Sequence, residues 1–336
     1  MKAAVLEQPG SLSVIDVETP LPRPGEVLIR VCACGICGTD QHIYHGQPGS
    51  AKVTFPIVLG HELAGEIVQV GSGVKDRSVG ERVSVDPNMY CGKCRFCRSG
   101  RIQLCERLQA VGVTRGGGMG EYCAVPAGNC FPIPDFMSDT EGALIEPLGC
   151  VLHGFKKLSV AKHDTVLVIG GGFIGQMFLQ LVRTKRPRRI LVSEPDVSKH
   201  DILKRFGAHE IINPYNHMQT VYYRSSADVV IECVGRKESM DMALTAAGRG
   251  GQVLMFGVAS PSTEIALSPF EVYSKELSIL GSFINPGTHA EAIELVRQNI
   301  VDVESAVTHR FRLQDMPDTM KDYPSLQVGK GVIQYK

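Results

Sequence analysis

The stretch Val166-Leu167-Val168-Ile169-Gly170-Gly171-Gly172-Phe173-Ile174-Gly175 passes from an apolar run into a cluster of glycines. The apolar run predicts a buried strand over 165–169, and the uncharged residues after the glycines predict an apolar helix over 173–183. A strand that leads through a tight turn into a helix is typical of a parallel, doubly wound sheet. A buried strand and helix also explain why 165–182 carries no charge, so a membrane span is not needed to account for it.

The glycines have the spacing G-x-G-x-x-G, which in this context is typical of a dinucleotide-binding loop. Gly170 permits the tight turn, Gly172 lets the backbone approach a pyrophosphate, and Gly175 lets the helix pack closely on the strand. Phe173 and Ile174 begin the helix, whose free N–H groups and positive dipole end are expected to hold the phosphates.

An acidic residue follows the next predicted strand: Glu194 lies 19 residues after Gly175. A carboxylate at this place accepts hydrogen bonds from both ribose hydroxyls and repels a 2′-phosphate, which favours NAD over NADP. Lys199 lies five residues further on and is expected to flank the same ribose. The alternative, a solvated acid at a strand end, is the weaker interpretation because of this placement.

The second half of the chain continues to alternate apolar runs with helical stretches, as parallel sheets require. The further predicted strands are 189–193, 210–212, 228–233, 252–257 and 277–281, with a helix at 197–206. A basic run at 183–189 ends the first helix, where cations suit the helix dipole. It therefore does not indicate nucleic acid or a 2′-phosphate.

Residues 1–150 predict a β-rich domain with long loops. The predicted strands there are 27–34, 66–70 and 81–85. After residue 285 the sequence predicts one amphipathic helix at 290–298 and a last strand at 331–335 that returns to the first domain. We therefore expect two domains, 1–150 completed by 286–336, and 151–285.

Four cysteines, Cys91, Cys94, Cys97 and Cys105, have the spacing C-x₂-C-x₂-C-x₇-C. Thiolates at this spacing can converge on one metal ion and complete a closed tetrahedral shell, as a structural zinc site requires. A closed site leaves no coordination position for chemistry, so a catalytic metal would need a second site.

Composition excludes some partners. Lys and Arg total 35, as do Asp and Glu, so no net field attracts nucleic acid or an anionic membrane. The first residues lack the apolar core of a signal peptide. Eleven cysteines without such a signal predict reduced thiols and a cytoplasmic protein.

Candidate ligands for the second metal occur in three separate segments. They are Gly35-Ile36-Cys37-Gly38-Thr39-Asp40-Gln41-His42, Gly60-His61-Glu62 and Ile145-Glu146-Pro147. Cysteine, histidine and carboxylate are ordinary zinc ligands, and three of them plus water form the catalytic pattern. Spacing alone does not show that the segments meet.

The three segments, the four-cysteine loop and the glycine loop, in this order, resemble the zinc-dependent medium-chain alcohol dehydrogenases over essentially the whole chain. The closest likeness is to the polyol branch of sorbitol, galactitol-phosphate, threonine and butanediol dehydrogenases, because Glu146-Pro147 stands where other alcohol dehydrogenases have a cysteine ligand. The resemblance implies a GroES-like β-rich catalytic domain and a Rossmann domain. It also implies a homodimer or homotetramer, with 277–283 near the subunit contact.

The resemblance implies roles at the matching positions. Cys37 and His61 would bind the catalytic zinc, and either Glu62 or Glu146 would supply the carboxylate ligand while the other holds water. Thr39 would pass the substrate proton outward. His42 either continues that relay to solvent or is a plain surface histidine.

The predicted reaction is hydride transfer to NAD from a secondary alcohol of a polyol, sugar acid or related small molecule, with one catalytic and one structural zinc. L-Threonine or 2,3-butanediol is the alternative substrate. A catalytically silent regulatory or structural member of the family is a third interpretation, which the intact motifs disfavour. Arg115, in a glycine-rich loop, is a candidate contact for an anionic substrate group.

Overall fold

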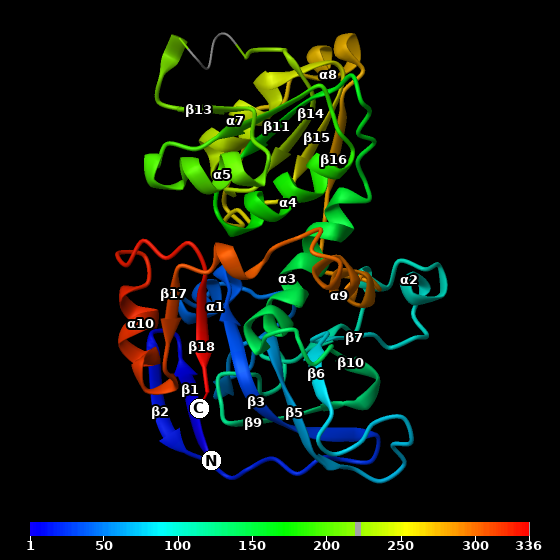
Figure 1. Ribbon diagram of the computed structural model, residues 1–336, viewed down its shortest axis with the longest axis vertical. Helices are drawn as coiled ribbons and strands as arrows, with labels where there is room; N and C mark the ends of the chain where they lie inside the picture. The colour runs from blue at the N-terminus through cyan, green and yellow to red at the C-terminus, as the bar shows by residue number, and fades with distance from the viewer. Residues whose placement is uncertain (219–222, 336) are drawn as a thin grey trace. The chain divides into compact units, whose positions relative to one another are not determined.

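The computed structural model describes residues 1–218 and 223–335 and divides into two compact units (Figure 1). One unit comprises Met1–Gly149 and Ile284–Lys336, and the other comprises Cys150–Phe283. The first is rich in antiparallel strands, and the second is built on a parallel sheet. Both architectures agree with those expected from the sequence.

The unit Cys150–Phe283 contains, over its described residues, a six-stranded sheet in the order β13-β12-β11-β14-β15-β16, with every pairing parallel. The strands are β11 (Thr165–Ile169), β12 (Arg189–Ser193), β13 (Glu210–Ile212), β14 (Ala227–Glu232), β15 (Ala247–Met255) and β16 (Ser278–Gly281). The strand order reverses between β11 and β14, which is the switch point where doubly wound sheets bind ligands.

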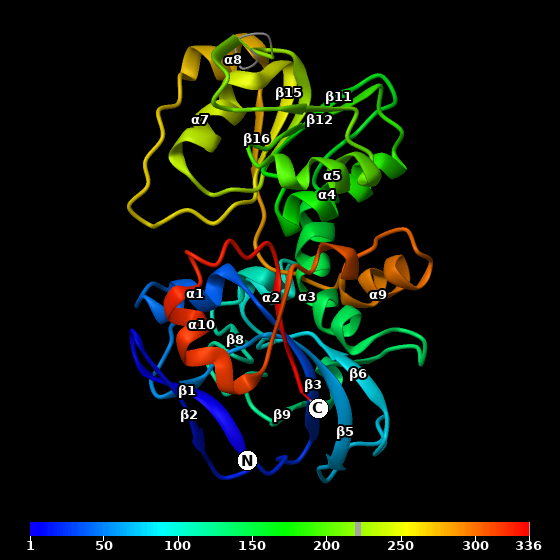
Figure 2. The same cartoon turned by 60° about the vertical axis from the view of Figure 1, so that its left-hand side comes forward.

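Helices connect these strands as crossovers. They are α4 (Phe173–Thr184), η3 (Val197–Lys199), α5 (His200–Phe206), α7 (Lys237–Ala246) and α8 (Pro269–Lys275). Helices α4 and α5 lie side by side in both views (Figures 1 and 2), and α7 packs on β14 and β15. Strand β11 is buried over its whole length, because the sheet is covered on both faces.

The unit that holds both chain ends is organised around β3 (Glu26–Ile36). Strand β3 pairs with β5 (Glu62–Val70), β9 (Tyr122–Pro126) and β18 (Gly331–Gln334). The last strand therefore returns to the first unit, as the sequence predicts.

The remaining elements of this unit form the rest of its sheets and its helices. The strands are β1 (Lys2–Gln8), β2 (Ser11–Asp16), β4 (Ile57–Val58), β6 (Arg82–Val85), β7 (Asn88–Met89), β8 (Gln109–Ala110), β10 (Cys130–Pro132) and β17 (His309–Phe311). The helices are α1 (Gly38–Tyr44), α2 (Arg95–Arg98), η1 (Ile102–Leu104), η2 (Ala127–Asn129), α9 (His289–Arg297), η4 (Glu304–Ala306), η5 (Leu313–Asp315) and α10 (Met316–Asp322), and α3 (Asp139–Phe155) begins here and ends in the other unit.

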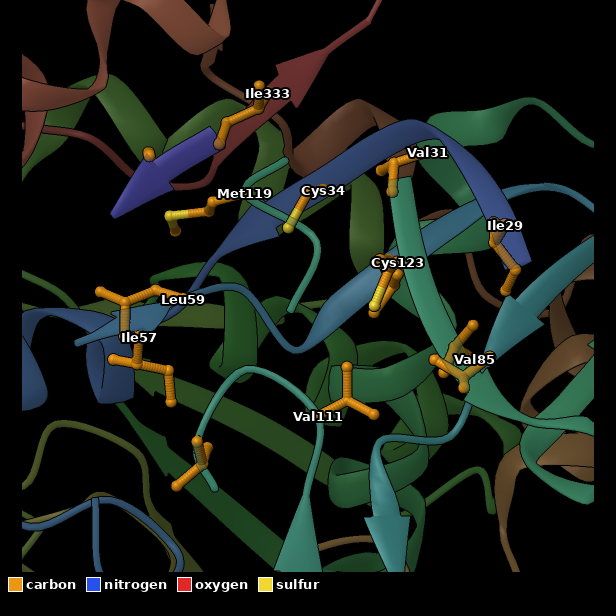
Figure 3. Packing of buried hydrophobic residues seen from close by; sticks show 14 of the residues in the cluster. Ile29, Val31, Cys34, Ile57, Leu59, Val85, Val111, Met119, Cys123 and Ile333 are labelled. Carbon is orange, nitrogen blue, oxygen red and sulfur yellow. The ribbon is translucent and has the colours of Figure 1, made fainter. Parts of the chain in front are cut away.

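An apolar cluster fills the centre of this unit, and Figure 3 shows Ile29 and Val31 of β3 beside Cys123 of β9 and Val85 of β6. Burial raises the pKa of the Cys123 thiol to about 12, so it behaves as a small apolar side chain. Cys34 and Cys130 are buried as well, whereas Cys32, Cys150 and Cys233 are partly exposed.

Helix α3 and strand β15 are among the elements in which the structure differs from the sequence prediction. Helix α3 carries Glu146, although Pro147 lies inside it; proline lacks the N–H of a helical hydrogen bond, so the pattern hides the helix. Strand β15 begins at Ala247 rather than at residue 252, because glycines in its first half weaken the strand pattern.

Among the described residues, no helix is both long enough and apolar enough to cross a membrane. The charge-free stretch 165–182 divides into β11 and α4.

Candidate metal and dinucleotide sites

The four cysteines of the predicted structural site converge. The Sγ atoms of Cys91, Cys94, Cys97 and Cys105 all lie within 4.8 Å of one another, close to the spacing of ligands around one tetrahedral zinc ion. Cys94 caps the short helix α2, and its Sγ accepts the N–H of Cys97 at 3.5 Å. The loop therefore brings the thiols together through local backbone geometry.

Backbone N–H groups favour the charged form of Cys94, whereas burial and hydrogen bonds with the neighbouring cysteines raise the pKa of Cys97 to about 12. The N–H groups of Cys97 and Glu106 lower the pKa of Cys94 to about 6. The N–H of Cys91 donates to Cys105 Sγ at 3.3 Å, and the N–H of Arg107 donates to the same sulfur at 3.4 Å. Thiolate is the form that binds a metal, so the cluster suits zinc.

A second group of donors comes from residues far apart in the sequence. One ligand atom each from Cys37, His61 and Glu62 lies within 4.8 Å of the others. Cys37 caps α1, His61 precedes β5, and Glu62 is the first residue of β5. Glu146, the other predicted carboxylate, is buried on α3 but lies outside this converging group.

Asp40 organises the second group, although its sequence motif did not predict this role. Its carboxylate accepts the N–H of Cys37 at 2.9 Å and the N–H of Gly60 at 3.2 Å, and one of its oxygens lies 3.5 Å from His61 Nδ1. Burial lowers the pKa of His61, but Asp40 and Cys37 outweigh burial and raise that pKa well above its usual value. The sequence signal that could have identified Asp40 is its position, because an acidic residue three positions after a helix cap completes a capping box.

The predicted proton-relay residues lie on α1. Thr39 is half-buried, and its N–H donates to Cys37 Sγ at 3.4 Å. His42 is half-buried in the last turn of the helix, and burial lowers its pKa, as does nearby His45. A relay through Thr39 and His42 stays a prediction.

The glycine loop has the geometry that a dinucleotide requires. Gly170 has φ +98°, and a Cβ on Gly175 would lie 1.8 Å from the Gly170 carbonyl oxygen, so the close contact of helix and strand needs glycine there. Gly172 caps α4 without a side-chain hydrogen bond, and Phe173 and Ile174 begin the helix. The first N–H groups of α4 are therefore placed to bind phosphate.

Glu194 is buried at the end of β12 and is held by the same loop. One of its oxygens accepts the N–H of Gly171 at 2.9 Å, and the other accepts the N–H of Asp196 at 2.9 Å. The Nζ of Lys199 lies 3.5 Å from the Glu194 carboxylate. The solvated alternative for Glu194 is therefore wrong.

Comparison with known proteins identifies the family. Residues 23–135 match the alcohol dehydrogenase GroES-like domain, and residues 174–298 match the zinc-binding dehydrogenase family. The chain is 33% identical over 328 residues to the sorbitol dehydrogenase of Bacillus subtilis, with 96% of this chain and 93% of that protein covered. The chain belongs to the zinc-binding alcohol dehydrogenase family.

This dehydrogenase is also similar to an L-threonine 3-dehydrogenase of Rhizobium etli, with 32% identity over 344 residues that cover 100% of this chain and 99% of the relative. A solved structure from Sinorhizobium meliloti 1021, described as a zinc-binding dehydrogenase bound to NADP, is 35% identical with a TM-score of 0.94 and 99% of each chain covered. The predicted family, and the predicted fold of a GroES-like and a Rossmann-type domain, are confirmed.

The two donor sets of this zinc-binding dehydrogenase fit the zinc that its family name implies. Four thiols suit a closed structural site, and a cysteine, a histidine and a carboxylate suit a catalytic site with an open position. His61 is buried, and its Nδ1, 3.5 Å from an Asp40 oxygen, has no hydrogen bond among the described residues, which leaves this nitrogen available to a metal ion or to a closer contact with Asp40.

The predicted contact between Arg115 and an anionic substrate is not supported. The Arg115 guanidinium donates to Glu26 at 2.7 Å and to the Ala124 carbonyl at 2.8 Å. Arg115 lines a cavity of about 600 Å³ that none of the predicted metal or dinucleotide residues borders. The charge of Arg115 is already paired with Glu26 within the fold.

Proposed function

We propose that this dehydrogenase oxidises a secondary hydroxyl of a polyol, sugar acid or related small molecule and transfers the hydride to NAD. The observation that carries the proposal is the convergence of Cys37, His61 and Glu62 within 4.8 Å in a chain of this family. These three donors leave a coordination position for the substrate oxygen, which the four-cysteine site does not.

A zinc ion bound there would supply a Lewis acid that lowers the pKa of the substrate hydroxyl. Asp40 holds both the Cys37 backbone and the loop before His61 in place. Thr39, beside the metal ligand Cys37, is proposed to accept the substrate proton, and His42 to pass it to solvent. Aligning the carbon with the nicotinamide is then the remaining task of the protein.

The proposed cofactor is NAD. The buried carboxylate of Glu194 would accept hydrogen bonds from the ribose hydroxyls, and its charge would repel a 2′-phosphate. Lys199 partly offsets that charge, at 3.5 Å from the carboxylate. The N–H groups at the start of α4 would hold the pyrophosphate.

L-Threonine or 2,3-butanediol is the second candidate substrate. It is favoured by the similarity to an L-threonine 3-dehydrogenase over the full chain and by His42 on the helix that begins after Cys37. The resemblance to threonine dehydrogenases implies a tryptophan in the loop after this histidine, but the protein has no tryptophan. Polyols therefore stay the preferred substrate class.

We propose further that the chain works in the cytoplasm as a homodimer or homotetramer. Strand β16 is one of the two terminal strands of the described sheet, and Ile279 within it and Phe283 just after it are exposed. Terminal strands present unpaired N–H and C=O groups that a second copy can pair with. Eleven free thiols suit a reducing compartment.

The test is NADH formation by the zinc-loaded protein over a panel of polyols, sugar acids, polyol phosphates, L-threonine and 2,3-butanediol. NADP and a chelator serve as controls. We expect chelator-sensitive turnover of one polyol-type class with NAD. Turnover of L-threonine or 2,3-butanediol instead would select the second candidate, and failure to bind NAD at all would favour a silent member of the family.

A further inference from the structure

Glu62 and Lys330, which are 268 residues apart in the sequence, form a buried ion pair. Lys330 Nζ lies 2.5 Å from a Glu62 carboxylate oxygen and donates to the Ile36 carbonyl at 3.1 Å. The two side chains are only 6% and 1% exposed. Removing either partner would leave an uncompensated charge away from water, so each depends on the other.

Strand pairing creates this contact. Strand β3 lies between β5 and β18, with Gly35 opposite Glu62 and Ile36 opposite Gly331, the residue after Lys330. Lys330 and Glu62 therefore reach toward each other across the end of β3, directly before Cys37 in the sequence. The contact needs a glycine beneath it, because a Cβ on Gly35 would lie 1.9 Å from Glu62 Oε2.

The backbone of Lys330 is fixed as well. Its carbonyl oxygen accepts the N–H of Thr308 at 2.9 Å and the N–H of His309 at 3.2 Å. Its own N–H donates to the Thr308 hydroxyl at 3.2 Å. These hydrogen bonds hold the backbone of Lys330 just before β18 and so fix the position of its ammonium beside Glu62.

Two positive charges therefore compete for the Glu62 carboxylate: a metal ion held by the donor group, and the Lys330 ammonium. The Glu62 carboxylate belongs to the converging donor group with Cys37 and His61, and it also faces the Lys330 ammonium. A lysine this close attracts the carboxylate and repels a metal ion, and both effects are strong where water is excluded.

We propose that Lys330 is a positioning residue that competes with the catalytic zinc for Glu62 and so limits how tightly this carboxylate holds the metal. The inference rests on the proposed zinc site. Its consequence is that Glu62 divides its charge between the ammonium and the metal, so the metal is held less tightly than it would be by an unpaired carboxylate. Lys330 acts on the metal through Glu62.

The test measures zinc affinity in competition with a chromophoric chelator, with zinc alone as the ligand. We expect Lys330→Met to raise the affinity of the catalytic site about tenfold, because the ammonium no longer holds the carboxylate or repels the metal; removing an ordinary supporting partner of a metal ligand would instead lower the affinity, by about 10-fold to 100-fold. Glu62→Gln should lower the affinity, the double variant should lie between the two, and Lys330→Arg should match the parent. Lys237→Met, which removes an exposed ion pair with Asp241, is the matched control.

Cobalt substitution gives a second measurement, the visible spectrum of the bound metal. This spectrum would not change if Lys330 had only a structural role. Lys330→Met should change the visible spectrum of the cobalt protein, because Glu62 then binds the metal fully, while Lys237→Met should leave it unchanged. The Cys37→Ser variant provides the signal of the four-cysteine site alone. This subtraction assigns the change to the catalytic site.

An unchanged or lower zinc affinity in folded Lys330→Met overturns the competition. If that variant does not fold, Lys330→Gln decides, because its neutral amide can still donate to Glu62 and to the Ile36 carbonyl; it should also raise the zinc affinity, and an unchanged or lower affinity overturns the inference. A parent protein that takes up zinc only at the four cysteines refutes the catalytic site itself, which is a separate outcome.

Discussion

The carboxylate of Glu194, at the end of β12, accepts a hydrogen bond of 2.9 Å from the backbone N–H of Gly171 in the loop after β11. The acid and the glycine loop, 23 residues apart, are therefore one site rather than two neighbouring motifs. Because the loop orients the carboxylate, its oxygens occupy a defined place at the carboxyl end of the sheet, where doubly wound folds bind nucleotides.

Replacing Glu194 with alanine should weaken the preference for NAD over NADP. The variant loses the ribose acceptor and the charge that repels a 2′-phosphate, and a charged hydrogen bond of this kind corresponds to a change of about 10-fold to 100-fold. The ratio of kcat/KM for the two cofactors measures the effect. Glu238→Ala, at an exposed position on α7, is the control, and an unaltered ratio in Glu194→Ala would count against the assignment.

Replacing Cys97 with serine should remove one zinc ion per chain and lower the melting temperature by about 10 °C, because structural zinc contributes directly to folding. NAD binding, followed by fluorescence, should persist in the folded fraction. Cys32→Ser, at a half-exposed cysteine outside the cluster, should keep both zinc content and stability. Full zinc content in Cys97→Ser would contradict a four-thiolate site.

The two candidate carboxylates can be separated by their glutamine variants. We expect Glu62→Gln to lose catalytic zinc, because Glu62 lies in the converging donor group, and Glu146→Gln to keep zinc but lose turnover. Cys37→Ser and His61→Asn should each lose the catalytic zinc and turnover while the chain stays folded. Metal analysis beside kcat checks this, and zinc loss in Glu146→Gln alone would make Glu146 the direct ligand.

His289 should make the protein sensitive to acid. It is 1% exposed, its Nε2 lies 2.8 Å from the Ser84 hydroxyl, and its Nδ1 has no hydrogen bond among the described residues. Burial lowers its pKa from 6.5 to about 3. The unfolded chain therefore binds the proton more readily, so stability from the neutral ring is complete above pH 6.5 and is lost as the pH falls toward 3.

Lowering the pH from about 7.5 to about 5 should thus cost about 2 kcal/mol at this residue. In His289→Gln, whose amide can still donate to Ser84, this part of the loss should disappear. Denaturant unfolding at both pH values, with excess zinc, measures the difference between the two proteins. Equal pH dependence in both would show that His289 does not titrate in this range.

The exposed edge of β16 should form a subunit contact. Light scattering coupled to size exclusion is expected to give the mass of a dimer or tetramer. Ile279→Lys should reduce that mass, because a lysine on an edge strand opposes pairing with another strand. Val197→Lys, at an exposed apolar residue on η3, is the control, and a monomeric parent protein would refute the contact.

Features encoded within a short stretch of sequence were predictable. The strand, glycine loop and helix of 165–183 follow from adjacent residues, and so does the four-cysteine cluster, because fifteen residues contain every ligand from Cys91 to Cys105. Local backbone geometry decides both, since a two-residue spacing turns thiols inward and a glycine permits φ +98° at Gly170.

The catalytic group depended on the tertiary structure. Cys37, His61 and Glu62 occur in motifs that the sequence displays, but only the pairing of β3 with β5 brings their donor atoms together. Nothing near Lys330 in the sequence predicts that it reaches Glu62, since that contact exists only because β18 returns to pair with β3. Local turns and the convergence of nearby ligands are decided by neighbours along the chain. The contact between Glu62 and Lys330, 268 residues apart, is decided by strand register and by the space that Gly35 leaves open.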